Sequence, residues 1–350
     1  MVTGMTPVIR KKDPCPCSSG RQYKDCCLKK EKRRNRDFHS DSLEAVRDIE
    51  IPGDIQIDSD DSGEISSKNS FESPVEELWN PTIVSAMTTE EIIKKLECMN
   101  VHFDKDQFLR QARGYVSACQ LADDHYYTQN WKGDTDEDFI WLAICELWKR
   151  FIPHQSSAEL IDEAIYNGYE FFYSGEYVNT CSEWRKAWDM IKKIMPSDIT
   201  DATIIPKSIP ISYDLSEWVE FYCEVLAHEG FEDSSYLHER ITFVREFMDT
   251  FPDTDSLVQY LLLTECESYA LLKNIEQAEL LFQSFIEKYP ENPRAYAIWG
   301  TMYWVYNDAG PDYEKALEIY RRGLARCIHN KRMILDQLKK MKKQRKLSSK

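Results

Sequence analysis

The chain has 350 residues, of which 42% are hydrophobic and 12% aromatic, and its formal net charge is −16. This length suits two domains, or one repeat scaffold with an appendage. The sequence has no apolar run of about 18 residues and no secretory apolar segment at its N-terminus, so we expect a cytoplasmic protein without a membrane span.

The charge is segregated along the sequence. Residues 1–36 and the last twenty residues each carry +8, whereas residues 37–80 carry −11 and residues 81–330 carry −21. Basic ends of this kind can bind nucleic acid or an acidic protein. They can equally dock on the acidic body of their own chain, and both interpretations stay open here.

Four of the eleven cysteines lie within one short N-terminal stretch. They form a Cys-x-Cys pair and, after eight further residues, a Cys-Cys pair, namely Cys15, Cys17, Cys26 and Cys27. Four thiolates on a short loop suit a tetrahedral Zn²⁺ ion at metal–sulfur distances of about 2.3 Å, and the same ligand set also suits iron. Because a stretch this short buries little apolar surface, the bound metal would supply the free energy that folds it. We expect one Zn²⁺ per chain.

The residues around these cysteines also favour a metal site. Pro14 and Pro16 each precede a cysteine and favour extended backbone, and Gly20 lets the chain reverse. A disulfide is disfavoured because the adjacent Cys26 and Cys27 pair poorly with each other. The remaining seven cysteines are scattered, which is typical of a reducing compartment. Four basic side chains would offset the negative charge of a Zn(Cys)₄ centre and could contact a partner: Arg21, Lys24, Lys29 and Lys30.

The run DPCPCSSGRQYKDCC, residues 13–27, resembles the SEC-C motif, the short zinc module at the C-terminus of the preprotein-translocase motor ATPase SecA. The family pattern reads roughly DPCPCGSGKKYKKCC, or ends in CH. This chain departs from it at Ser18, where a glycine is usual, and at Cys27, where histidine is common. The resemblance implies that Cys15, Cys17, Cys26 and Cys27 are the ligands. It also implies contacts with the ribosome, a chaperone or the protein-export machinery.

Residues 37–75 are acidic, rich in serine and nearly free of aromatic residues, which predicts a flexible linker. From Trp79 onward, apolar residues recur at spacings of three and four, which predicts helices almost without interruption. Thr88-x-x-Glu91 and Ser156-x-x-Glu159 are capping-box patterns that predict two helix starts. The predicted helices cover residues 88–99, 104–121, about 135–152, 156–169, 177–195, 214–228, 233–250 and 254–272.

Three prolines interrupt the helical pattern between residues 196 and 213, which predicts a connector between two helical halves. Beyond residue 270 the sequence shows internal similarity that resembles the tetratricopeptide repeat, with Ala278 and Ala316 in equivalent positions. The resemblance is carried by small residues where two helices cross and by large ones around them, namely Gly300, Ala316 and Gly323, and Tyr303, Tyr313 and Tyr320. The last residues predict a basic helix that either caps the stack or binds a partner.

No catalytic motif is present: the sequence has no HExxH, GxGxxG, P-loop or GxSxG pattern. A closed Zn(Cys)₄ site also leaves no open position for a substrate. We therefore expect no enzyme. His228 and His238 flank an acidic loop and are a second candidate metal site. The single cysteines on apolar helix faces are interpreted as core residues.

These observations predict an all-α protein, with a tetratricopeptide-like helical body and a small N-terminal zinc knuckle on an acidic linker. We expect a non-enzymatic zinc-binding adaptor that contacts a protein partner. The alternatives are binding of nucleic acid, ribosomal RNA in particular, through the basic zinc module, and an enzyme with an unrecognised site in the helical body. The predicted domains are residues 1–36 (metal module), 37–75 (linker), 76–200 (helical domain), 201–213 (connector), 214–330 (repeats) and 331–350 (basic tail).

Overall fold

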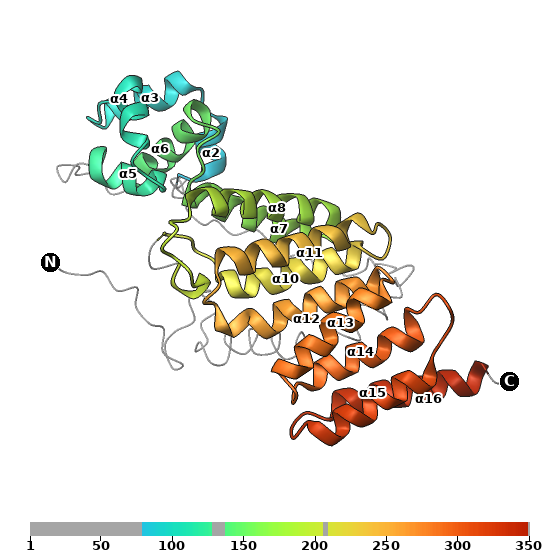
Figure 1. Ribbon diagram of the computed structural model, residues 1–350. Coiled ribbons are helices and arrows are strands. Elements are labelled where there is room, and N and C mark those ends of the chain that lie inside the picture. Colours follow the sequence, from blue (N-terminus) through green and yellow to red (C-terminus); the bar gives the residue numbers. More distant parts are fainter. Residues whose placement is uncertain (1–78, 128–136, 206–208, 349–350) are drawn as a thin grey trace, which may run out of the picture. The chain divides into compact units, whose positions relative to one another are not determined.

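The computed structural model describes residues 79–127, 137–205 and 209–348 (Figure 1). In these ranges the chain forms fourteen α-helices and one short 3-10 helix, with no strand. The predicted all-α fold is therefore confirmed. The domain boundaries stay a prediction.

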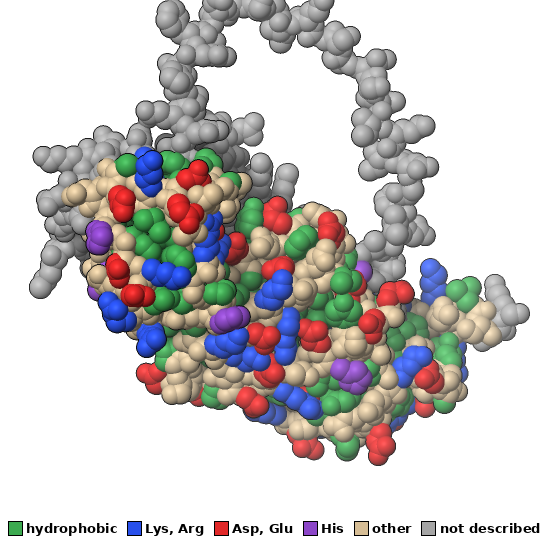
Figure 2. All heavy atoms as spheres, turned by 90° about the horizontal axis from the view of Figure 1, so that it is seen from above, with side chains coloured by type: hydrophobic (Ala, Val, Ile, Leu, Met, Phe, Trp, Pro, Cys, Tyr) green, Lys and Arg blue, Asp and Glu red, His purple; other side chains and the backbone are tan. Residues whose placement is uncertain are grey.

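Figure 2 shows one face of the helical body, with side chains coloured by type. On the face that Figure 2 presents, acidic and basic side chains lie interspersed, with apolar side chains between them. Within the described part of the chain, no helix is both long enough and apolar enough to cross a membrane.

The first five helices share one buried core. Phe108, Phe139 and Trp148 are among its fully buried side chains, and the Phe108 and Trp148 rings meet edge to face with their centroids 6.4 Å apart. Aromatic burial of this kind stabilises a small helical group strongly. The helices are α2 (Pro81–Ala86), α3 (Thr89–Cys98), α4 (Lys105–Ala112), α5 (Ala118–His125) and α6 (Glu137–Phe151).

The single helix predicted for residues 104–121 is wrong, because the chain forms α4 and α5 there. Helix α4 ends at Ala112, and Gly114 lies in the break that follows. The Ser117 hydroxyl then accepts a hydrogen bond from the Gln120 amide at 3.1 Å, which starts a new helix. A serine N-cap satisfies an amide that would otherwise lack a partner, so it can restart a helix within an apolar pattern.

One of the two predicted capping boxes forms and the other does not. In α3 the Thr88 hydroxyl accepts from the Glu91 amide at 3.2 Å, and the Glu91 carboxylate accepts from the Thr88 amide at 2.7 Å. Helix α7 (Ala158–Tyr173) is capped by Ser157 instead of the predicted Ser156. Its Glu159 side chain does not reach back to its own helix start, and its partners are described below.

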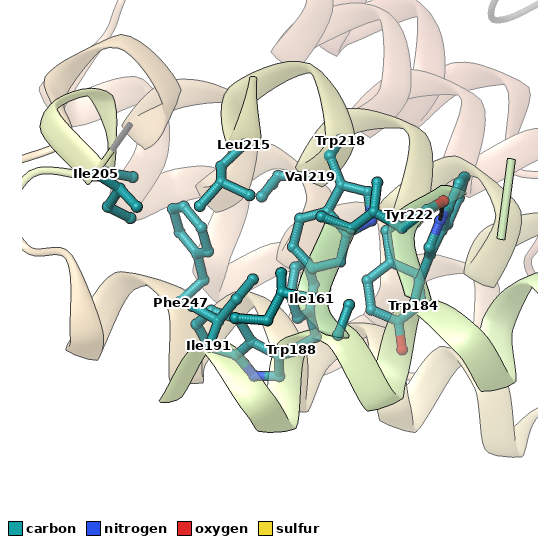
Figure 3. Close-up of a cluster of buried hydrophobic side chains, with 14 of the residues drawn as sticks. Ile161, Trp184, Trp188, Ile191, Ile205, Leu215, Trp218, Val219, Tyr222 and Phe247 are labelled. Carbon is teal, nitrogen blue, oxygen red and sulfur yellow. Dashed lines mark hydrogen bonds between the residues drawn. The ribbon is translucent and has the colours of Figure 1, made fainter. Parts of the chain in front are cut away.

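A second core lies among α7, α8 (Tyr177–Ile194), α10 (Leu215–Glu229) and α11 (Ser235–Thr250). Figure 3 shows the buried side chains Trp184, Trp188, Trp218 and Tyr222 gathered between these helices. The predicted connector contains the short 3-10 helix η2 (Ala202–Ile204). Its isoleucines Ile205, Ile209 and Ile211 are buried in this same core, whereas Ile204 is exposed. Helices on both sides of the connector thus share one core.

The remaining helices pack in an order consistent with stacked repeats. Each of α10, α12 and α14 contacts the next helix in the chain and also the helix after that. Such contacts arise when helical hairpins stack on their neighbours. The helices are α12 (Asp255–Leu271), α13 (Ile275–Lys288), α14 (Pro293–Val305), α15 (Tyr313–Arg326) and α16 (Arg332–Ser348).

Small residues permit the close approach of α14 and α15. A Cβ atom at Gly300 would lie 2.2 Å from the Tyr320 ring, so any larger residue there would displace the ring. The Tyr320 hydroxyl accepts a hydrogen bond from the Trp304 indole at 2.9 Å. Ile334 and Met341 of α16 are buried in this third core, as expected for a terminal capping helix. The likeness to tetratricopeptide repeats in particular stays a prediction.

Candidate functional site

The predicted metal ligands and basic partner contacts all precede the first described residue, so the structure gives no geometry for them. They are Cys15, Cys17, Cys26 and Cys27, and Arg21, Lys24, Lys29 and Lys30. The predicted one-zinc stoichiometry therefore depends on the sequence pattern alone.

The helical body presents a group of tyrosines that we call the α7 tyrosine face, made of Tyr166, Tyr169 and Tyr173 of α7 together with Tyr213. Tyr166 is 53% and Tyr173 is 61% exposed, which is unusual for such large side chains. Tyr169 stacks against Tyr173 and Tyr213, with ring centroids 6.3 and 5.8 Å apart. Helical spacing explains the arrangement, since residues three and four apart share one side of α7.

Carboxylates surround the α7 tyrosine face. Burial raises the pKa of Tyr169, and the charges of Glu217 and Asp214 raise it further. The pKa of Tyr213 is raised by burial and by Asp162. The hydroxyls of Tyr169 and Tyr213 are therefore neutral hydrogen-bond donors in a negative field at physiological pH.

A pocket of about 340 Å³ adjoins this face and includes Tyr213 in its wall. The segment before α10 is fixed here by Asp162, whose carboxylate accepts from the Ser212 amide at 2.9 Å and from the Ser212 hydroxyl at 2.6 Å. Burial raises the pKa of Asp162. The pocket is lined by Ala202, Thr203, Ile211, Ser212, Tyr213, Asp214, Leu215 and Ser216.

Aromatic rings among carboxylates are suited to binding cationic side chains. Lys and Arg gain about 0.5–2 kcal/mol over the face of an aromatic ring, and a nearby carboxylate adds a charge-assisted hydrogen bond. Tyrosine is also enriched at protein interfaces. Sequence reasoning missed this face, although the spacing of Tyr166, Tyr169 and Tyr173 was a usable signal.

A second cluster lies where α7 meets the start of α5. The Glu159 carboxylate accepts hydrogen bonds from the Ser117 hydroxyl at 2.5 Å, the Ala118 amide at 2.9 Å and the Cys119 amide at 3.0 Å. Burial raises the pKa of the Glu159 carboxyl, but these hydrogen bonds outweigh that effect and hold the pKa below its ordinary value. Glu159 thus caps a helix that lies about forty residues earlier in the chain.

Two thiols adjoin this carboxylate. Cys119 of α5 and Cys145 of α6 are half-buried, and their Sγ atoms lie 3.6 Å apart. The hydrogen bond with Cys119 and burial raise the pKa of Cys145, while the charge of Lys149 acts in the opposite direction. Cys145 packs against the first core, as interpreted from the sequence, but the sequence did not predict that Cys119 would lie beside it. They are 26 residues apart in the sequence, so only the packing of α5 on α6 brings them together.

The histidine candidate is wrong. Ligand atoms of Cys119, Cys145 and Glu159 all lie within 4.8 Å of one another, and no other group of three potential metal ligands meets this condition in the described ranges. His228 instead lies 3.0 Å from the Glu229 carboxylate and packs against the Tyr177 ring.

Comparison with known protein families finds a match at the N-terminal cysteine-rich stretch. Residues 12–29 match the family model of the SEC-C motif. No curated protein and no solved structure matches the chain. The matched residues include all four predicted ligands. The chain therefore carries a SEC-C motif, which is a zinc-binding type of motif, in its first thirty residues.

Proposed function

We propose that this protein is a non-enzymatic, zinc-dependent interaction protein that joins two partners. The observation that carries the proposal is the SEC-C motif at residues 12–29, with a cysteine at each of its four ligand positions. One Zn²⁺ held by Cys15, Cys17, Cys26 and Cys27 would fold the module, because so short a segment has no core of its own.

The folded module would present its basic side chains to the first partner. Arg21, Lys24, Lys29 and Lys30 lie between and directly after the ligands, so metal binding would fix their relative positions. By resemblance to other SEC-C modules, the first partner is the ribosome, a chaperone or a component of protein export. Capture by this module would depend on the metal as well as on charge.

The helical body would hold the second partner on the α7 tyrosine face. Tyr166 and Tyr173 are exposed beside the carboxylates that act on Tyr169 and Tyr213. Charge complementarity selects a protein segment that carries Lys or Arg between apolar residues. The adjoining pocket has room for one side chain of such a segment.

Two arginines of α11, one buried and one half-exposed, pair with side chains of α12. Arg240 is fully buried and donates to Glu267 at 3.0 Å and to Ser268 at 3.3 Å. Arg245 contacts Glu265 at 2.5 Å. These pairs join α11 to α12.

The proposal is tested by capture from a lysate with three forms of the full chain: the natural sequence, Cys26→Ser/Cys27→Ser, and Tyr166→Ala/Tyr173→Ala. We expect each variant to lose a different set of captured proteins. Leu280→Ala is the matched control, since Leu280 is 57% exposed on α13, outside the face. Identical capture by all forms would contradict the proposal.

Salt dependence separates the proposal from the nucleic-acid alternative. Binding of ribosomal RNA by the basic module would weaken steeply as salt rises, because counterions are released from phosphates. Binding that survives nuclease treatment and moderate salt would favour a protein partner. Binding that nuclease abolishes would favour the alternative.

A further inference from the structure

We propose that Cys119, Cys145 and Glu159 form a second metal site, separate from the SEC-C motif, which takes one thiophilic divalent cation such as Zn²⁺. The three residues come from α5, α6 and α7, so the site exists only in the folded body. It goes beyond the proposed function, in which the N-terminal cysteines hold the only metal ion.

The distance between the two sulfur atoms fits a shared metal ion. At metal–sulfur distances of about 2.3 Å, two thiolates on one tetrahedral ion are separated by about 3.8 Å. The observed separation of the Cys119 and Cys145 Sγ atoms is 3.6 Å. An ion could therefore bind between them with little movement of α5 or α6.

The carboxylate supplies the third ligand atom. Glu159 Oε1 accepts from both the Ser117 hydroxyl and the Cys119 amide, whereas Oε2 accepts from the Ala118 amide. A carboxylate oxygen can accept at two positions, so Oε2 retains one for a cation. The hydrogen bonds also fix the orientation of the carboxylate, as the outer-shell partners of metal ligands do.

The fourth position would be filled by water. Cys119, Cys145 and Glu159 are all half-buried, so an ion can reach them from solvent. Two thiolates and one carboxylate carry three negative charges against the two positive charges of the ion. Binding would convert both thiols to thiolates and release their two protons to solvent.

A purely structural interpretation explains only part of the cluster. Capping of α5 accounts for Glu159, and it requires no thiol nearby. Two thiols can also share a weak hydrogen bond at this distance. The two interpretations differ in one measurable respect, because only a metal site predicts saturable binding of a soft cation.

The experiment uses the full chain with Cys15, Cys17, Cys26 and Cys27 replaced by serine, so that the SEC-C ligands cannot contribute. The reduced, metal-free protein is titrated with Cd²⁺, and cadmium–thiolate absorption is followed in the near ultraviolet. We expect saturation at one equivalent. Adding Cys119→Ser/Cys145→Ser should abolish the absorption, whereas adding Cys98→Ser, which removes an exposed thiol elsewhere, should leave it unchanged.

Glu159→Gln keeps an oxygen acceptor for α5 but removes the charge of the ligand. Loss of a group that only hydrogen-bonds to a metal ligand lowers metal affinity by roughly 10-fold or more. Because Glu159 is itself a proposed ligand, Glu159→Gln should weaken Cd²⁺ binding by more than this roughly 10-fold. Absorption that persists without Cys119 and Cys145, or that never appears, would overturn the proposal.

Alkylation with mass spectrometry gives an answer even if the cysteine variants fail to fold. In the same background with both thiols intact, Zn²⁺ should slow the alkylation of Cys119 and Cys145 together and leave Cys98 unaffected. Equal alkylation rates with and without Zn²⁺ would overturn the proposal. The result is independent of whether the SEC-C motif binds zinc.

Discussion

Helices α3 and α7 begin with the same sequence pattern, a hydroxyl residue followed three positions later by glutamate, yet they use the glutamate differently. Glu91 turns back and accepts from the Thr88 amide, which closes a local capping box. Glu159 turns away from its own helix and caps α5 through three hydrogen bonds. The glutamate at the start of α7 therefore links two helices, whereas the glutamate at the start of α3 caps its own helix.

The difference shows what a local pattern can predict. A capping box predicts that a helix begins nearby, and helices do begin at both places. It does not predict which amides the glutamate accepts from when the start of another helix lies nearby and its amides also lack acceptors. The break between α4 and α5 creates such amides, and the neighbouring α7 satisfies them.

The largest effect should come from Glu159→Ala. This change leaves the Ser117 hydroxyl and the amides of Ala118 and Cys119 without their acceptor in a partly buried place. We expect the free energy of unfolding to fall by roughly 2–4 kcal/mol. Urea unfolding of the full chain measures this free energy. A decrease as small as that caused by Glu91→Ala would contradict the role of Glu159 in linking α7 to α5.

A second prediction tests whether α7 is equally constrained further along its length. A Cβ atom at Gly168 would lie 2.1 Å from the Trp184 indole nitrogen, and Trp184 is fully buried. Gly168→Ala should therefore reduce the free energy of unfolding by about 2 kcal/mol through overpacking.

Gly114→Ala is the matched control for this substitution. Its Cβ atom would meet only the Gln111 carbonyl oxygen, at an ordinary contact distance of 3.7 Å. We expect a change of about 0.5 kcal/mol or less. If the two substitutions lowered the free energy of unfolding equally, the contact of Gly168 with Trp184 of α8 would not be what makes Gly168→Ala destabilising.

Much of the body could be predicted from the sequence, because its helices are long and their apolar spacing is regular. Helix α8 was predicted at 177–195 and spans Tyr177–Ile194, and α11 was predicted at 233–250 and spans Ser235–Thr250. The largest error is the break between α4 and α5, where Ser117 starts a new helix. The distant Glu159 also accepts from the first amides of α5, which no local pattern predicts.

The two candidate metal sites also differ in whether the sequence predicts them. The SEC-C motif could be found from the sequence because its ligands are close together in the chain, and the family model confirms the resemblance. The pairing of Cys119 with Cys145 could not be found, because it depends on how α5 packs on α6.

A third prediction concerns acid. Hydrogen bonding holds the pKa of Glu159 below its ordinary value of 4.5. Its contribution to stability is therefore complete above that value and is lost as the pH falls through the lowered pKa. Glu159→Gln carries no such proton-linked contribution. The difference in unfolding free energy between the natural protein and this variant should therefore shrink below pH 4.5. A difference that stays constant between pH 7 and pH 3 would contradict the assignment.

The smallest effect should come from Glu91→Ala. The Glu91 carboxylate is exposed to solvent, and water can replace it at the Thr88 amide. We expect a decrease in unfolding free energy that is measurable but well below that of Glu159→Ala. A larger decrease would mean that the Glu91 carboxylate also supports a neighbouring element.

The most direct test of the proposed function is the zinc content of the full chain, purified without an affinity metal and compared with its Cys26→Ser/Cys27→Ser variant. Elemental mass spectrometry would measure zinc per chain in each. We predict that the variant contains one equivalent less than the natural sequence, because it has lost two of the four SEC-C ligands. Equal zinc content in the two forms would contradict zinc binding by the SEC-C motif, and with it the metal-dependent interaction that we propose.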